Sequence, residues 1–189
     1  QVYANSGNPF AGVFVDTNGD GIINQNDLYK GKSADPNLFL GFSTSLTYKK
    51  WNAGFVLRAN TGNYMYNNLY SQTGTLNQLI GNTILYNASA KYLATQFKGG
   101  NGQELLSDYY IQNASFLRMD NFSLGFNAGK IYHQKLNLRV SAIVQNVFVI
   151  TKYKGLDPEI GAGTGNNPGI DNNFYPRPRV FSLGLNLDF

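Results

Sequence analysis

Residues 38–48, LFLGFSTSLTY, decide the fold class, because large apolar and small polar side chains alternate along them. Successive side chains of a β-strand point to opposite faces of the sheet, so a period of two predicts a strand. One predicted face carries Leu38, Leu40, Phe42, Thr44, Leu46 and Tyr48. The other carries Phe39, Gly41, Ser43, Ser45 and Thr47.

The same alternation returns four more times along the chain. A turn at KKWN leads into residues 51–60, which place Trp51, Phe55 and Leu57 on one face. Further strands are predicted over residues 116–128, 136–150 and 179–189. The sequence therefore predicts an all-β chain of about five antiparallel strands.

The polar faces of these strands favour a membrane barrel over a soluble β-sandwich. They carry Ser, Gly and Asn, and only 14% of the chain is charged, against about a quarter in soluble domains. The apolar bands have the roughly 9–11 residues with which a tilted strand crosses a bilayer. Aromatic residues near the band ends, among them Tyr48 and Trp51, are typical of interfacial girdles. A soluble sandwich remains the alternative, since its strands alternate as well.

The connections point the same way. Short links (KKWN and GKIYHQK) alternate with long ones at residues 61–114 and 152–178. Outer-membrane barrels have short periplasmic turns and long extracellular loops. Because five strands leave open edges that cannot stand in lipid, we expect them to be the C-terminal strands of a larger transmembrane β-barrel. A plug domain and the earlier strands are expected to lie outside residues 1–189.

A calcium loop is predicted at residues 16–27, DTNGDGIINQND, which follow the D-x-N-x-D-G spacing of an EF-hand loop. The expected ligands are the side chains of Asp16, Asn18, Asp20 and Asp27, the Ile22 carbonyl, and Asn24 through a water. Position twelve is Asp where Glu is usual, and no amphipathic helices flank the loop. The alternative is a turn held by side-chain hydrogen bonds without metal. The loop is expected to be extracellular.

The long segment 61–114 contains NYMYNNLY and a short helical pattern around residues 84–97. Loops of this length are usually functional or disordered. A substrate-binding role in stacking on and hydrogen bonding to sugars is considered for Tyr64, Tyr66, Asn67, Asn68 and Tyr70. The alternative is that these side chains pack against neighbouring loops or a covering protein.

The remaining charged and reactive residues do not indicate a catalytic, zinc or nucleic-acid site. Arg118 and Asp120 share the apolar phase with Phe122, so we expect them near the membrane surface unless a bulge turns them inward. One His (His133) and no Cys leave no catalytic triad or zinc cluster to assemble, so the chain is not expected to be an enzyme. The Lys and Arg are scattered, which argues against nucleic-acid binding.

Four segments, taken in order, resemble the C-terminal end of the SusC/RagA-type TonB-dependent transporters of Bacteroidetes outer membranes. They are DTNGDGIINQND, SFLRMDNFSLGF, NVFVITKYKGLDPEI and YPRPRVFSLGLNLDF. The resemblance implies a barrel of about 22 strands with a plugged lumen. It also implies import of a glycan, oligosaccharide or peptide, energy from the TonB complex, and a SusD-like lipoprotein as a lid.

The last strand also resembles the signal that the barrel-assembly machinery reads. Its apolar residues are Phe181, Leu183, Leu185, Leu187 and the terminal aromatic Phe189. A second hypothesis from another class is a secreted, calcium-stabilised β domain that binds carbohydrate as an adhesin.

Overall fold

The computed structural model describes residues 14–75, 88–95, 97, 107–132, 135–159, 169–171 and 175–188. The chain divides into two compact units. The sheet unit comprises Pro36–Gly62, Ala114–Lys152 and Tyr175–Phe189, and the loop unit comprises Gln1–Asp35, Asn63–Asn113 and Tyr153–Phe174. Each is described by itself. No helix within the described residues is long and apolar enough to cross a membrane.

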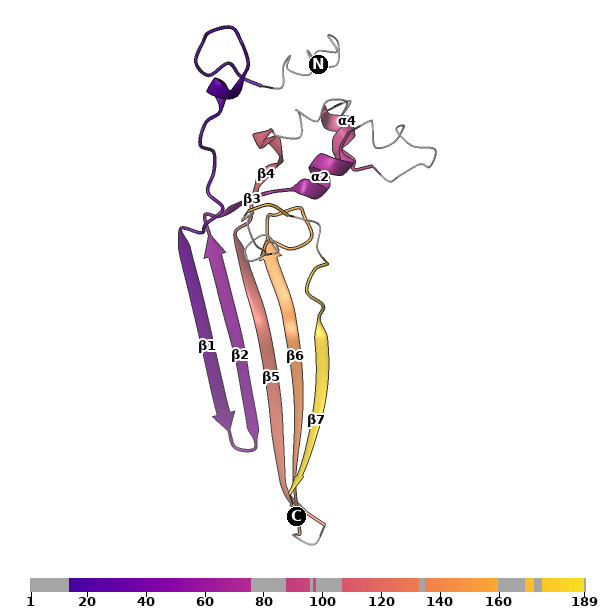
Figure 1. The fold of residues 1–189 in the computed structure, drawn as a ribbon. Helices are drawn as coiled ribbons and strands as arrows, with labels where there is room; N and C mark the ends of the chain where they lie inside the picture. The colour runs from indigo at the N-terminus through magenta and orange to yellow at the C-terminus, as the bar shows by residue number, and fades with distance from the viewer. Residues whose placement is uncertain are drawn as a thin grey trace. The chain divides into compact units, whose positions relative to one another are not determined.

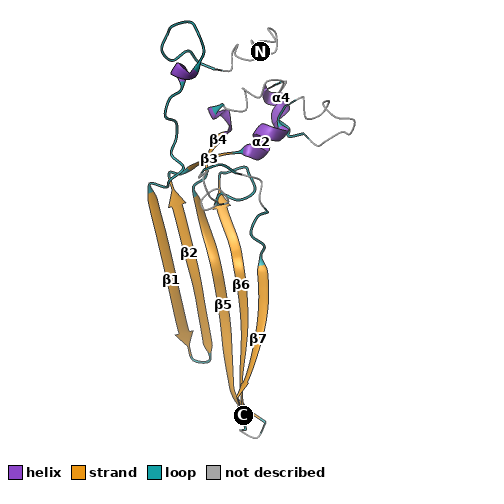
Figure 2. Cartoon of the chain, viewed as in Figure 1, coloured by secondary structure: helices purple, strands orange, loops and turns teal. Residues whose placement is uncertain are grey.

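The sheet unit is a five-stranded antiparallel sheet, ordered β1-β2-β5-β6-β7 (Figures 1 and 2). The strands are β1 (Leu38–Tyr48), β2 (Trp51–Thr61), β5 (Phe116–Ile131), β6 (Leu136–Thr151) and β7 (Val180–Asp188). All five predicted strands are confirmed, with ends that differ by at most three residues. β2 and β5 are neighbours although residues 62–115 separate them in sequence.

The register gathers the apolar residues on one face. Across β1 and β2, Tyr48 pairs with Trp51, and across β2 and β5, Trp51 pairs with Phe126, whose ring lies 4.6 Å from it between centroids. A row across all five strands is Leu46, Ala53, Leu124, Ala142 and Leu183. Leu183 and Leu185 are 86% and 74% exposed, so these side chains are not part of a water-excluding core.

The opposite face is lined by small and polar residues. One row across the sheet is Thr47, Asn52, Gly125, Ser141 and Gly184. This arrangement is the inverse of a soluble sheet that packs its apolar face on a core. It matches the apolar-out, polar-in alternation of membrane barrels.

Two bulges interrupt this regular pattern near one end of the sheet. The ladder between β5 and β6 shifts between Met119 and Asn121, and the ladder between β2 and β5 shifts between Val56 and Leu57. Arg118 consequently pairs with Arg58, and it is the next residue, Met119, that pairs with Leu57 of the apolar face. The expectation that Arg118 and Asp120 continue the apolar phase was therefore wrong, and the bulge alternative holds: a one-residue insertion changes the face of the residues before it.

The loop unit contains short elements: η1 (Gln25–Asp27), β3 (Tyr64–Tyr66), α2 (Asn68–Thr73), α4 (Lys91–Thr95), η3 (Asp108–Tyr110) and β4 (Ile111–Asn113). β3 pairs antiparallel with β4 and forms a parallel bridge from Tyr66 to Ile170. The interior includes Met65, Tyr110 and Tyr153. α4 lies within the predicted helical pattern, of which residues 84–87 and 96 lie outside the described part.

Candidate functional site

The loop at residues 16–27 is held by its own acidic and amide side chains. The Asp16 carboxylate accepts hydrogen bonds from the N–H groups of Gly19 and Gly21, both at 2.7 Å. Asn18 Oδ1 accepts from the Asp20 N–H at 2.8 Å, and Asp20 Oδ1 accepts from the Ile22 N–H at 2.7 Å. Gly19 and Gly21 have φ of +77° and +82°, which glycine adopts without strain.

Asp27 closes the loop. Its carboxylate accepts from the N–H groups of Asn24 at 2.8 Å and Thr17 at 2.9 Å, and it completes a capping box with Asn24 at the start of η1. The backbone hydrogen bond from Asn24, followed by those from Thr17 and Asn18, lowers the pKa of Asp27 below its ordinary value despite burial. Asp27 is therefore ionised at neutral pH.

The loop's donor chemistry fits a hard cation, because its side chains and the Ile22 carbonyl offer oxygen atoms. Each ionised carboxylate keeps lone pairs beyond those that its N–H partners use. Among the described residues, however, no three acidic or histidine side chains are grouped as metal ligands would be. The Ile22 carbonyl also accepts from the Asn24 amide at 3.2 Å. The turn alternative thus describes this conformation, and calcium binding stays a prediction.

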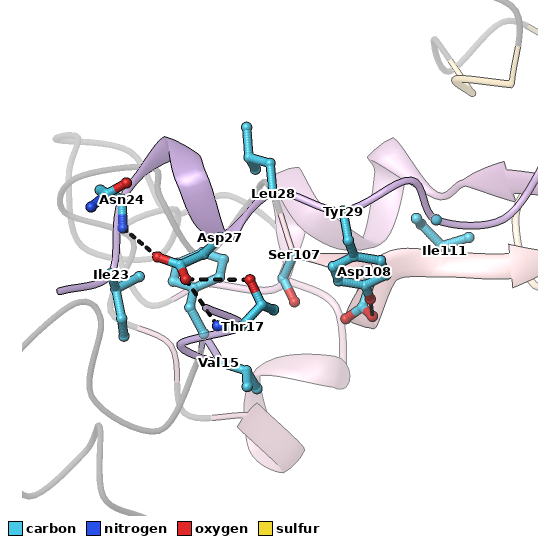
Figure 3. A pocket seen from close by; sticks show the side chains of 12 residues that line it. Val15, Thr17, Ile23, Asn24, Asp27, Leu28, Tyr29, Ser107, Asp108 and Ile111 are labelled. Carbon is cyan, nitrogen blue, oxygen red and sulfur yellow. Dashed lines mark hydrogen bonds between the residues drawn. The ribbon is translucent and has the colours of Figure 1, made fainter. Parts of the chain in front are cut away.

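A cavity of about 270 Å³ lies beside this loop (Figure 3). Its walls include Val15, Ile23, Leu28, Ser107 and Ile111. Two of its lining residues are bonded to each other: the Tyr29 hydroxyl donates to Asp108 at 2.5 Å, and this bond raises the pKa of Tyr29. Sequence reasoning missed the pair, because its members are 79 residues apart and no local pattern joins them.

The residues considered for sugar binding lie together around β3 and the start of α2. Tyr64 and Tyr70 are half-buried, with Lys32 and Lys91 over their respective rings at 5.4 and 5.6 Å. Tyr66 stacks edge-on with Tyr110 at 6.1 Å.

The two asparagines of this group serve the loop itself. Asn67 is fully buried, and its Oδ1 caps α2 by accepting from the Tyr70 N–H at 3.0 Å. The backbone carbonyl of Asn68 accepts a hydrogen bond from the Ser71 hydroxyl at 3.1 Å. In this conformation Asn67 does not reach solvent, so the packing alternative describes this residue. Substrate contact stays a prediction for the half-buried residues of the group.

Two further residues of interest, His133 and Phe189, lie outside the described residues. The other members of the predicted assembly signal, Phe181, Leu183, Leu185 and Leu187, lie on β7 with the apolar row and are 46–86% exposed.

Comparison of the sequence with those of known proteins shows which proteins the chain resembles. A scan against models of protein families finds no match. The chain is 39% identical over 195 residues to the TonB-dependent receptor SusC of Bacteroides thetaiotaomicron, which covers 100% of the chain and 19% of the receptor. It is 28% identical over 194 residues to the TonB-dependent receptor P3 of Formosa agariphila, covering 96% of the chain and 19% of the receptor.

Comparison of structures gives the same result for the fold. The RagAB peptide transporter superposes with a TM-score of 0.63 at 24% identity, over 90% of this chain and 20% of the transporter chain. The same importer in a closed-closed state gives a TM-score of 0.62. The chain spans about a fifth of the length of the relatives it matches. The five-stranded sheet matches a fragment of a TonB-dependent β-barrel, and the chain is similar over its whole length to a section of the SusC/RagA-type TonB-dependent receptors.

Proposed function

We propose that the chain is the C-terminal part of an outer-membrane barrel that imports a nutrient with energy from TonB. The observation that carries this proposal is the exposed apolar face that runs in register across all five strands. Such a face is stable against lipid, and the small polar face then lines a lumen. The identity to SusC supports the same conclusion, whereas the adhesin hypothesis finds no support in the comparisons.

The proposed partners follow from the relatives. A SusD-like surface lipoprotein would cover the outer mouth, and the TonB complex would act through a region outside this chain. The imported molecule is proposed to be a glycan, an oligosaccharide or a peptide. The RagAB relative is a peptide transporter, and the tyrosines around β3 offer stacking surfaces to either class.

The test uses the full-length protein in a host whose own copy has been deleted. The protein is expected in the outer-membrane fraction, and uptake of labelled oligosaccharides or peptides is expected to require both this protein and TonB. Deleting TonB should reduce uptake to the level of cells that lack the transporter. Recovery in the soluble fraction, or uptake that does not change without TonB, would contradict the proposal.

We also propose that the loop at residues 16–27 binds calcium. Asp16, Asn18, Asp20, Asp27 and the Ile22 carbonyl would coordinate the ion, with Asn24 acting through water. Calcium would draw oxygens that now accept N–H bonds onto one centre and so stabilise this exposed loop.

Calcium binding is expected to show a dissociation constant of about 10⁻⁴–10⁻³ M, as in extracellular modules. Titration calorimetry on the full-length protein measures it. Asp16→Ala should abolish binding, whereas Asp35→Ala, which removes an exposed acid outside the loop, should leave it intact. Because N–H hydrogen bonds lower the pKa of Asp27 in the folded loop, its contribution to the stability of the loop is complete above about pH 4 and is lost as the pH falls further. Equal binding by both variants would disprove the site.

A further inference from the structure

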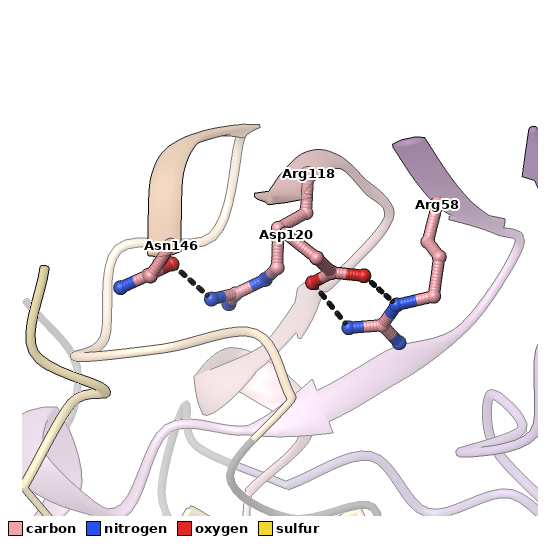
Figure 4. Close-up of polar contacts among 4 residues, drawn as sticks. All are labelled: Arg58, Arg118, Asp120 and Asn146. Carbon is pink, nitrogen blue, oxygen red and sulfur yellow. Dashed lines mark hydrogen bonds and ion pairs between the residues drawn. The ribbon is translucent and has the colours of Figure 1, made fainter. Parts of the chain in front are cut away.

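Four arginines and one aspartate gather on the polar face of the sheet unit, at the bulges of β5 and β6. Arg58 forms a two-pronged ion pair with Asp120, in which Nε and Nη2 each donate to one carboxylate oxygen (Figure 4). Arg118 is 1% exposed and donates from Nη1 to Asn146 Oδ1 at 2.7 Å. The cluster thus joins three strands: β2, β5 and β6.

Asn146 fixes the segment that leads into β7. It has φ of +51°, a conformation that asparagine tolerates better than most residues, and it sits in the bulge of β6. Its Nδ2 donates to the Arg177 carbonyl at 2.6 Å, and its own carbonyl accepts from Arg179 Nε at 3.3 Å. One bulge residue therefore holds Arg118, Arg177 and Arg179 around the same point.

These residues surround a groove of about 440 Å³. It is lined by Arg118, Asp120, Asn121, Gln145, Asn146 and Arg177, together with Pro178 and Val180. Among the described residues of this lining, Asp120 is the one acid, and both of its oxygens are already bound by Arg58. Within the part of the chain that the structure describes, the groove and its immediate surroundings hold four guanidinium groups and one carboxylate, so positive groups outnumber negative ones there.

Guanidinium groups bind carboxylates with paired, charge-assisted hydrogen bonds, and buried cations are stabilised by a counter-charge. Asn121, Gln145 and Asn146 add amide groups that accept and donate around such an anion. The chemistry of the groove thus favours a ligand that carries at least one carboxylate.

We propose that this groove binds a carboxylate of the imported molecule, and that the transporter prefers acidic over neutral substrates. This inference rests on the proposed function, because it takes the polar face as the wall of the import path. An acidic oligosaccharide and an acidic peptide offer the same carboxylate chemistry, so the test includes both.

The experiment is titration calorimetry of the purified full-length protein in detergent. One pair of probes is hexaglutamate and hexaglutamine, and the other is trigalacturonate and its neutral galactose counterpart. The acidic member of at least one pair is expected to bind about tenfold more tightly than its neutral partner, the order of one charge-assisted hydrogen bond.

Arg177→Gln should remove this preference, and Arg177→Lys should restore part of it. The Arg177 side chain is exposed, and its carbonyl bond to Asn146 survives either change, so the sheet should still form. The matched control is Arg139→Gln, which removes an exposed arginine from the same polar face, on the row Asn127, Arg139 and Asn186 at the other end of the strands.

Retention of the acidic preference in Arg139→Gln together with its loss in Arg177→Gln supports the inference. Equal affinity for acidic and neutral probes, no binding of either acidic probe, or the same loss in both variants overturns it. The measurement needs no energised membrane. A negative binding result therefore does not contradict the proposed function. That function would be contradicted by recovery in the soluble fraction or by uptake that does not depend on TonB.

Discussion

Replacing Leu183 with arginine is expected to remove most of the protein from the outer membrane. Leu183 lies in the middle of β7, is 86% exposed, and ends the apolar row that begins at Leu46. A cationic side chain on the lipid face near the bilayer midplane costs about 2–4 kcal/mol. The strand also carries the proposed assembly signal, so insertion should suffer as well as stability. Fractionation and blotting of the full-length protein measure the effect.

The matched control is Ser182→Arg, one residue earlier on the same strand. Ser182 pairs with Ile143 of β6 on the opposite face, so its arginine would enter the lumen instead of lipid. Near-normal outer-membrane levels are expected for this variant. If the two variants reach the outer membrane equally, the assignment of the apolar face to lipid is wrong.

The second large effect is expected from Tyr153→Phe in the loop unit. The Tyr153 hydroxyl donates to Asp171 Oδ2 at 2.7 Å, and the two residues are 5% and 0% exposed. Burial, and then the contact with Asp171, raises the pKa of Tyr153, so the phenol stays neutral and keeps donating at all pH values below about 10. Removing a partner from a buried carboxylate costs about 1–3 kcal/mol or more.

Amide hydrogen exchange at the neighbouring backbone measures the local destabilisation caused by losing the Tyr153–Asp171 hydrogen bond. The Tyr66 N–H donates to the Gly169 carbonyl at 2.7 Å, and the Asp171 N–H donates to the Tyr66 carbonyl at 3.0 Å. These amides are expected to exchange roughly tenfold faster or more in Tyr153→Phe, as a cost of that size implies. Tyr175→Phe, which changes a side chain that is 96% exposed, should leave their exchange as it was. Unchanged exchange in Tyr153→Phe would show that the hydroxyl does not hold this segment.

The strands could be predicted from sequence because each carries its own period-two signal. The alternation in residues 38–48 places Leu40 and Phe42 on one face whatever the neighbouring strands are, and the register of the sheet then aligns these faces. The two-residue turn at Lys49 and Lys50 is equally local. These features need no knowledge of distant segments.

The arginine cluster could not be predicted in the same way. Arg58, Arg118 and Arg177 are far apart in sequence, so a search for basic runs finds none of them together. The bulge near Asp120 shifts the alternation by one residue, so that the apolar phase passes from Leu117 and Met119 to Phe122 and Leu124. A period-two assignment that ignores this shift places Arg118 on the apolar face. The backbone register places it on the polar face.

The loop unit was partly predictable. The D-x-N-x-D-G spacing of residues 16–21 gave the tight turn and its glycines, since the positions that need positive φ are marked by residue type. Spacing alone does not show whether the oxygens converge on a metal. The contacts of Asp171 with Tyr153 and Tyr66 depend on chain segments that carry no shared pattern.

The pairing of β2 with β5 across residues 62–115 has a consequence for how this inserted segment can change. Closing a flexible connection costs entropy that grows only with the logarithm of its length, so doubling the insertion costs about 0.6 kcal/mol. The pairs β1–β2, β5–β6 and β6–β7 do not span this insertion. Evolution can therefore lengthen or rewrite this insertion at little thermodynamic cost, and the same sheet can carry different recognition loops.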